Sequence, residues 1–127
     1  MQNYNFFLNT IHFGKVFIYQ KVDLFDIQSA ISLIESFTQS IDSFENYRND
    51  LKTQSAVERQ LAIIGEVVSK LKHENSNFPL SNAKQMIDFR NRLIHSYDNI
   101  DCSIVWVIIR KHIPILKEEV GLYINDK

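Results

Sequence analysis

The stretch RNRLIHSY, residues 90–97, gathers side chains that can carry out phosphate chemistry. Arg90 has a planar, permanently charged guanidinium whose donors match phosphate oxygens. His95 can act as a general acid or base, because the ordinary pKa of imidazole is about 6.5. Asn91 can orient a neighbouring group or donate to phosphate, and Arg92 adds a second cation. These residue types together suit the binding and cleavage of a phosphodiester.

A helix through this stretch would separate its two most reactive side chains. At about 100° per residue, Arg90 and His95 lie roughly 140° apart around an ideal helix. Either the helix ends near Ile94 and turns His95 inward, or the site uses two chains. Asn91 and His95 are four residues apart and share a helix face, so Asn91 can orient the imidazole.

Each of these residues also has a structural interpretation, and the spacing alone favours it. An arginine in a helix seam is often ion-paired, here with Glu66 or Asp88. A histidine near a helix C-terminus stabilises the helix as a terminal positive charge. A tyrosine at position 97 is most often a core or interface residue with a hydrogen-bonded hydroxyl.

The surrounding chain predicts an all-α fold, an antiparallel bundle of four main helices. Few glycines and prolines occur, and apolar residues recur every three to four positions over long stretches. The predicted helices cover residues 23–43, 53–72, 81–96 and 101–123, with a short helix at 44–49. A helical domain is therefore expected at residues 23–123.

Single residues predict where these helices begin, bend and approach one another. Asp23, Ser43 and Asp101 are suitable N-cap residues. Gly65 lies inside a helix, at a cost of about 1 kcal/mol relative to alanine, and predicts close approach of another helix. Pro114 is expected to kink or split the last helix, because it lacks an N–H group.

Residues 1–22 form an N-terminal extension that is harder to interpret. They are rich in aromatic residues, and residues 12–20 have a strand-like composition. A single strand would have no partner in an all-α fold. An irregular arm or a short helix is therefore expected.

The helix at 81–96 has an interrupted apolar stripe. Steps of four, three, four and three residues lead from Ala83 through Ile87, position 90 and Ile94 to position 97. Position 90 should be apolar but is Arg90, and the stripe ends on Tyr97. A charged group in an apolar seam is costly unless it is paired or meets an anion, which predicts a polar pocket, a subunit interface or both.

The composition indicates the cellular compartment of the protein and excludes some kinds of site. The net charge is −1, so the whole protein is not an electrostatic nucleic-acid binder, although its second half is more basic than its first. One cysteine, Cys102, permits no internal disulfide and fits the cytoplasm. The four histidines are scattered without metal-ligand spacing, so no metal and no cofactor are expected. No apolar run is long enough for a bilayer.

The stretch FRNRLIHSYDNID, residues 89–101, resembles the R-x4-H-x-Y motif of HepT-like toxins in the HEPN superfamily. The resemblance extends backward through AVERQLAIIGEVVSKL and DIQSAISLIESF. It extends forward through IVWVIIRKHIPILKEEV. It therefore covers residues 23–120, most of the chain.

The resemblance implies a homodimeric helical bundle that cleaves RNA without metal, as the toxin of a type II toxin–antitoxin system. It implies that Arg90 and His95 are catalytic, with Asn91 and Arg92 in support. It also implies a partner, an MntA-like nucleotidyltransferase antitoxin that adds AMP to Tyr97. Two alternatives are a catalytically inert dimer that binds nucleotide or nucleic acid, and a partner subunit of a nucleotidyltransferase.

Overall fold

The computed structural model describes residues 2–125, with side chains for residues 20–96 and 98–125. Every regular element in this described part is helical, which confirms the predicted all-α class. Two short helical turns are η1 (Tyr97–Asn99) and η2 (Ile108–His112). The helices are α1 (Gln2–Thr38), α2 (Phe44–Arg48), α3 (Leu51–Glu74), α4 (Ala83–His95), α5 (Cys102–Val107) and α6 (Ile113–Asn125).

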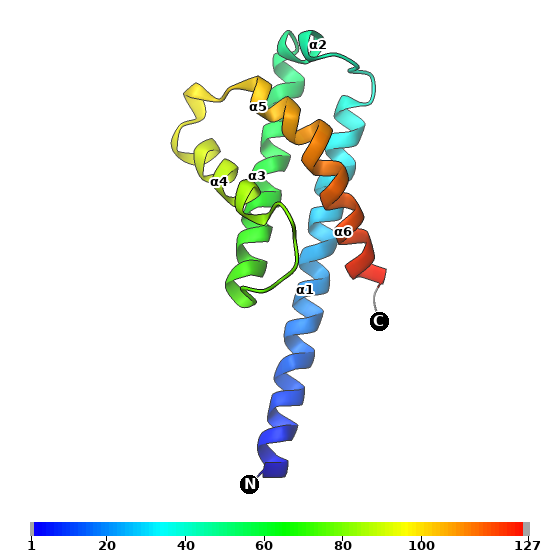
Figure 1. Cartoon of the computed structure of the whole chain (residues 1–127), viewed down its shortest axis with the longest axis vertical. Helices are drawn as coiled ribbons and strands as arrows, with labels where there is room; N and C mark the ends of the chain where they lie inside the picture. Colours follow the sequence, from blue (N-terminus) through cyan, green and yellow to red (C-terminus); the bar gives the residue numbers. More distant parts are fainter. Residues whose placement is uncertain (1, 126–127) are drawn as a thin grey trace.

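The helices pack around α3 and the second half of α1, which contact each other extensively (Figure 1). On the outer side of α3 lies α4, while α6 packs along α1. At one end of the bundle, α5 crosses above α3 and contacts α2. This arrangement places α4 at the edge of the bundle, with α3 as its main neighbouring helix.

The core is formed by the predicted apolar stripes. Burial of such side chains from water contributes about 1.5–3 kcal/mol each, which is the main force that holds the bundle together. The stripe of α3 is buried at every predicted position, and that of α1 is buried from Leu24 to Ile34. The buried stripe residues are Leu24, Ile27, Ile31 and Ile34 of α1 and Val57, Leu61, Ile64, Val68 and Leu71 of α3.

Three helices have an N-cap residue whose side chain accepts a hydrogen bond from the first turn. Ser43 accepts a hydrogen bond from the N–H of Asn46, and Asp101 accepts one from Ser103. Both caps were predicted. Asp50 caps α3 by accepting from the N–H of Thr53, at 3.0 Å, and from its hydroxyl, at 2.7 Å. These bonds satisfy N–H groups that have no partner inside their helix.

The first helix differs most from the prediction. It begins at Gln2, so Asp23 lies inside α1 and is not its N-cap, and residues 2–22 form neither an irregular arm nor a separate short helix. This segment holds no proline and only one glycine, so nothing in it interrupts a helix. A domain boundary between residues 22 and 23 stays a prediction. No helix within residues 2–125 has both the length and the apolar character needed to span a membrane.

The last helical segment continues through Pro114, so the predicted split is not observed. The chain stays helical from α5 through η2 into α6, and η2 is a π turn directly before the proline. Within it the N–H of Ile113 donates to the carbonyl of Ile108, one residue further back than in an α-helix. Because Pro114 cannot donate, this wider turn takes up the change in hydrogen bonding.

Candidate active site on α4

The buried face of α4 coincides only in part with the predicted stripe. Ala83, Met86 and Phe89 are buried against the core, whereas Ile94 is 48% exposed. The buried set shares Ala83 with the predicted stripe, whereas Met86 and Phe89 lie outside that stripe. Arg90 is half-buried and lies in the contact with α3.

Gly65 of α3 lies directly against Arg90. A Cβ atom added at position 65 would overlap the Cβ of Arg90 and would lie 2.7 Å from the carbonyl oxygen of Met86. Only a glycine permits this approach, which confirms the prediction that Gly65 brings another helix close. The position of Arg90 is thus set by a backbone-to-backbone contact between α3 and α4.

The guanidinium of Arg90 has donors that the protein leaves open. Its Nη1 donates to the side-chain oxygen of Asn91 at 3.1 Å. Its Nε is buried and has no partner in the described part of the chain. No described carboxylate lies within 4 Å of it, and Asp88 pairs instead with Lys84 at 3.6 Å. The predicted structural ion pair is therefore not formed, and a half-buried positive charge is available for an anion.

His95 is the last residue of α4, and its side chain is exposed. The alternative in which the helix ends near Ile94 and turns His95 inward is therefore wrong. No hydrogen bond joins Asn91 to His95 in the described side chains, since the Asn91 oxygen accepts from Arg90 instead.

The remaining residues of the motif lie at the C-terminal end of α4. Arg92 is exposed in the last turn, where positive charge is favourable next to the unpaired carbonyls. Tyr97 begins the turn η1, and its side chain lies outside what the structure describes. Beyond the turn, hydrogen bonds from Ser103 and, to a smaller extent, the charge of Arg92 lower the pKa of Asp101, which therefore stays ionised at neutral pH.

Two features of this region were not predicted. The glycine inside a helix was the only sequence signal for the Gly65 contact, and it did not identify Arg90 as the residue opposite. A groove between α4 and α5 is lined by Phe89 and His112, among others. No sequence signal brought these two residues together, because they come from helices whose packing depends on the whole bundle.

Comparisons with known proteins agree with the motif. The family model described as "Ribonuclease HepT-like" matches residues 27–121. A Thermococcus cleftensis protein named "Probable ribonuclease HepT" is 40% identical over 93 residues, which cover 72% of this chain and 84% of the relative. A Methanocaldococcus jannaschii protein named as an RNase is 35% identical over 103 residues, which cover 80% of this chain and 94% of that protein.

A similar relative from Caldanaerobacter subterraneus, also named as an RNase, is 37% identical over 82 residues, which cover 61% of this chain and 70% of the relative. No solved structure gives a significant match. The family match spans most of the chain and includes the α3–α4 contact and the whole motif. The chain belongs to the HepT-like family of ribonucleases.

Proposed function

We propose that this protein is a metal-independent endoribonuclease that acts in the cytoplasm as the toxin of a type II toxin–antitoxin system. The observation that carries the proposal is the half-buried guanidinium of Arg90, which has no carboxylate partner in the described chain. A fixed guanidinium without a counter-ion suits the phosphate of a nucleic acid. Membership of a ribonuclease family identifies RNA as the substrate class.

RNA cleavage without metal needs a base, an acid and a group that stabilises negative charge. The 2′-oxygen attacks the adjacent phosphorus and loses its proton to an imidazole acting as base. The bond from phosphorus to the 5′-oxygen breaks, and a second imidazole protonates the leaving oxygen. Arg90, assisted by Asn91 and Arg92, stabilises the charge that develops on the phosphoryl oxygens. The products are a 2′,3′-cyclic phosphate and a 5′-hydroxyl.

One motif supplies a single histidine, so the acid and the base come from two chains. A homodimer with α4 at its twofold axis brings two His95 side chains to one phosphate. The exposure of His95 and the 48% exposure of the neighbouring Ile94 favour this arrangement, because α4 presents both to solvent in the single chain.

Regulation of the site takes place at Tyr97. An MntA-like nucleotidyltransferase transfers AMP from ATP to its hydroxyl and releases pyrophosphate, which adds a negatively charged phosphate to the motif that holds Arg90 and His95. That phosphate competes with RNA for the same cations and repels the incoming backbone. The AMP-modified protein is expected to lose RNA binding, and equal RNA affinity of both forms, measured by fluorescence anisotropy, would contradict this.

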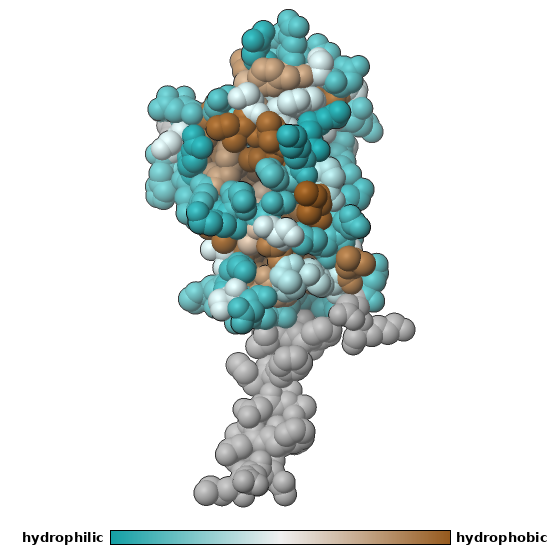
Figure 2. All heavy atoms as spheres, viewed as in Figure 1, coloured by the Kyte–Doolittle hydropathy of each residue, from teal (hydrophilic) through white to brown (hydrophobic). Residues whose placement is uncertain are grey.

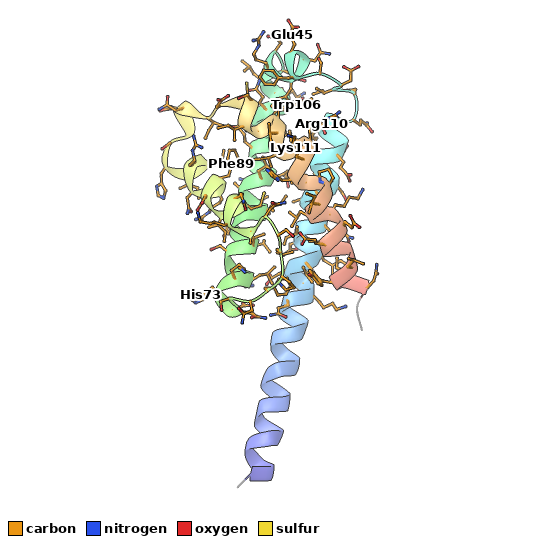
Figure 3. All side chains as sticks on the ribbon, viewed as in Figure 1. Glu45, His73, Phe89, Trp106, Arg110 and Lys111 are labelled. Atoms are coloured by element: carbon orange, nitrogen blue, oxygen red, sulfur yellow. The ribbon has the colours of Figure 1, made fainter. Side chains whose placement is uncertain are left out.

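A cleavage assay with His95→Ala tests the proposed activity. We expect this variant to cleave RNA about 10²–10⁴ times more slowly than the wild type. Chelation of metals should leave the wild-type rate unchanged, and a 2′-deoxy substitution at the cleavage site should abolish cleavage. His73→Ala is the matched control, because His73 is also exposed but lies at the far end of α3 (Figure 3).

The outcome separates the ribonuclease from the alternative functions. Equal rates for His95→Ala and wild type would refute the catalytic role of His95. RNA that is bound but never cleaved, with binding lost only in Arg90 and Arg92 variants, would identify an inert binding module. A protein that neither binds nor cleaves RNA would instead be a partner subunit of a nucleotidyltransferase.

A further inference from the structure

A groove of about 390 Å³ lies between α4 and the segment formed by α5 and η2. Its walls are largely apolar and include the side chains of Phe89, Ile104, Val107 and Ile108. Figure 2 shows it as a hollowed hydrophobic area on the face toward the viewer. Its volume lies near the lower end of the range of about 300–1,000 Å³ that is typical of small-ligand sites.

Polar groups around the groove are open to a ligand. The Nδ1 atom of His112 is buried and has no hydrogen-bond partner in the described part of the chain. Ser103 donates its hydroxyl proton to Asp101 at 2.7 Å, so its oxygen remains free to accept. Gln85 offers an exposed side-chain amide at the rim. An aliphatic occupant would leave the buried nitrogen unpaired, whereas a flat ring with polar edges would not.

The groove opens on the side of α4 that carries Arg92 and His95. Asp88 and Arg92 line it, and His95 follows Arg92 by three residues, so these side chains share one helix face. Three residues correspond to about 4.5 Å along the helix axis. A nucleotide next to a phosphate bound at His95 would therefore lie at the mouth of the groove, beside the cation of Arg92.

We infer that this groove binds one base of the RNA strand, next to the phosphate that is cleaved. A nucleobase has apolar faces that fit between Phe89 and the aliphatic residues of α5, and edges with donors and acceptors for His112, Ser103 and Gln85. The inference rests on the proposed ribonuclease function and adds a source of base preference to it. Cleavage then depends on the identity of one neighbouring base.

Methyl NMR of the full-length protein tests base binding without any cleavage. The probes are the four ribonucleoside 5′-monophosphates, with ribose 5-phosphate as the control that lacks a base. At least one nucleotide should shift the methyl signals of Ile104, Val107 and Ile108 in a saturable way. Ribose 5-phosphate should leave them unchanged, because it carries the phosphate alone.

Blocking variants locate the binding. Val107→Trp fills the mouth of the groove from a side chain that is 42% exposed, and the shifts of Ile104 and Ile108 should be lost. Gln85→Trp, from the α4 side, should have the same effect and serves if the first variant does not fold. Leu122→Trp is the matched control, since Leu122 is 65% exposed on α6 and lines none of the described pockets; it should retain the shifts.

Three results would overturn the inference. The nucleotides could leave the groove methyls unchanged, or ribose 5-phosphate could shift them equally. The same methyls could instead respond to protein concentration alone, which would identify the groove as a contact between two copies. The ribonuclease function is tested separately, because none of these results bears on RNA cleavage by His95. A protein that binds bases in the groove but leaves RNA intact would refute only the ribonuclease function.

Discussion

The backbone of α3 at Gly65 approaches Arg90 so closely that only glycine fits at position 65. We expect Gly65→Ala to push α4 away from α3 and to move the Arg90 guanidinium from its place. Overpacking of this kind costs about 1–3 kcal/mol, while alanine returns about 1 kcal/mol of helix propensity. Stability should therefore fall by up to about 2 kcal/mol. RNA cleavage by the folded protein should fall about 10- to 100-fold, since a small misplacement of a catalytic group has a large kinetic effect.

Gly121→Ala is the control for this experiment. Gly121 is also helical, but a Cβ atom added there meets nothing within 4 Å. This variant should keep full cleavage activity and should become slightly more stable. If Gly65→Ala cleaves RNA as fast as Gly121→Ala, the contact with α3 does not position Arg90.

Tyr47 has a fully buried hydroxyl with no hydrogen-bond partner among the described residues. Burial, reinforced by the charge of Glu58, raises the pKa of Tyr47 far above its ordinary value, so the hydroxyl stays protonated. An unpaired buried hydroxyl costs about 1–3 kcal/mol. We expect Tyr47→Phe to raise the melting temperature and to keep the ring contact with Trp106, whose centroid lies 5.4 Å away.

The matched variant Tyr123→Phe should act in the opposite direction. The Tyr123 hydroxyl donates to the carbonyl of Pro79 at 2.7 Å, and its loss should cost about 0.5–1.5 kcal/mol. Thermal denaturation of both variants makes the comparison. A lower melting temperature for Tyr47→Phe would mean that its hydroxyl has a partner, such as a bound water.

Single residues also show what the sequence could predict about the site. The residue types and spacing of Arg90, Asn91 and His95 indicated phosphate chemistry, and that interpretation agrees with the family match. The hydrogen bond between Arg90 and Asn91 was not predictable, because it depends on the side-chain conformation that the contact with Gly65 imposes.

Among the helices, the cap of α3 gives a prediction with a pH dependence. Hydrogen bonds from the Thr53 hydroxyl and N–H lower the pKa of Asp50 below its ordinary value. A carboxylate with a lowered pKa in the folded state stabilises the protein above its unfolded pKa, about 3.9, and this stabilisation is lost as the pH falls through the folded value. Asp50→Ala should therefore lower the melting temperature by about 2–6 °C at pH 7.

The difference between Asp50→Ala and wild type should shrink as the pH falls below about 4, because the wild-type carboxylate then becomes protonated. Glu118→Ala, an exposed change on α6, should leave the melting temperature unchanged at every pH. A difference for Asp50→Ala that stays constant down to pH 2 would show that the ionised cap is not the cause.

Helices were predicted best where one face is buried along its whole length. Every predicted position of the α3 stripe is buried, since this helix contacts α1 on one side and α4 on another. The stripe of α4 was predicted only in part, because a helix at the edge of the bundle buries only part of its surface. The start of α1 was missed since residues 2–22 carry no cap or breaker, and a strand-like composition does not prevent a helix.

The single chain is an incomplete site in the proposed mechanism. It presents one Arg90, whose donors are open, and one exposed His95 at the end of α4. The chemistry needs two imidazoles, and two chains were one of the two alternatives that the angular separation of these residues left open. The arrangement of the two copies could not be predicted, because it depends on surface shape and not on periodicity.

Subunit mixing tests the two-chain ribonuclease site most directly. Equal amounts of wild type and His95→Ala are mixed, allowed to exchange subunits and assayed for RNA cleavage per total protein. Random pairing leaves about one quarter of the dimers with two wild-type chains. The proposed mechanism predicts about one quarter of the wild-type rate, because mixed dimers have only one His95; about one half would mean that each chain acts alone and would contradict it.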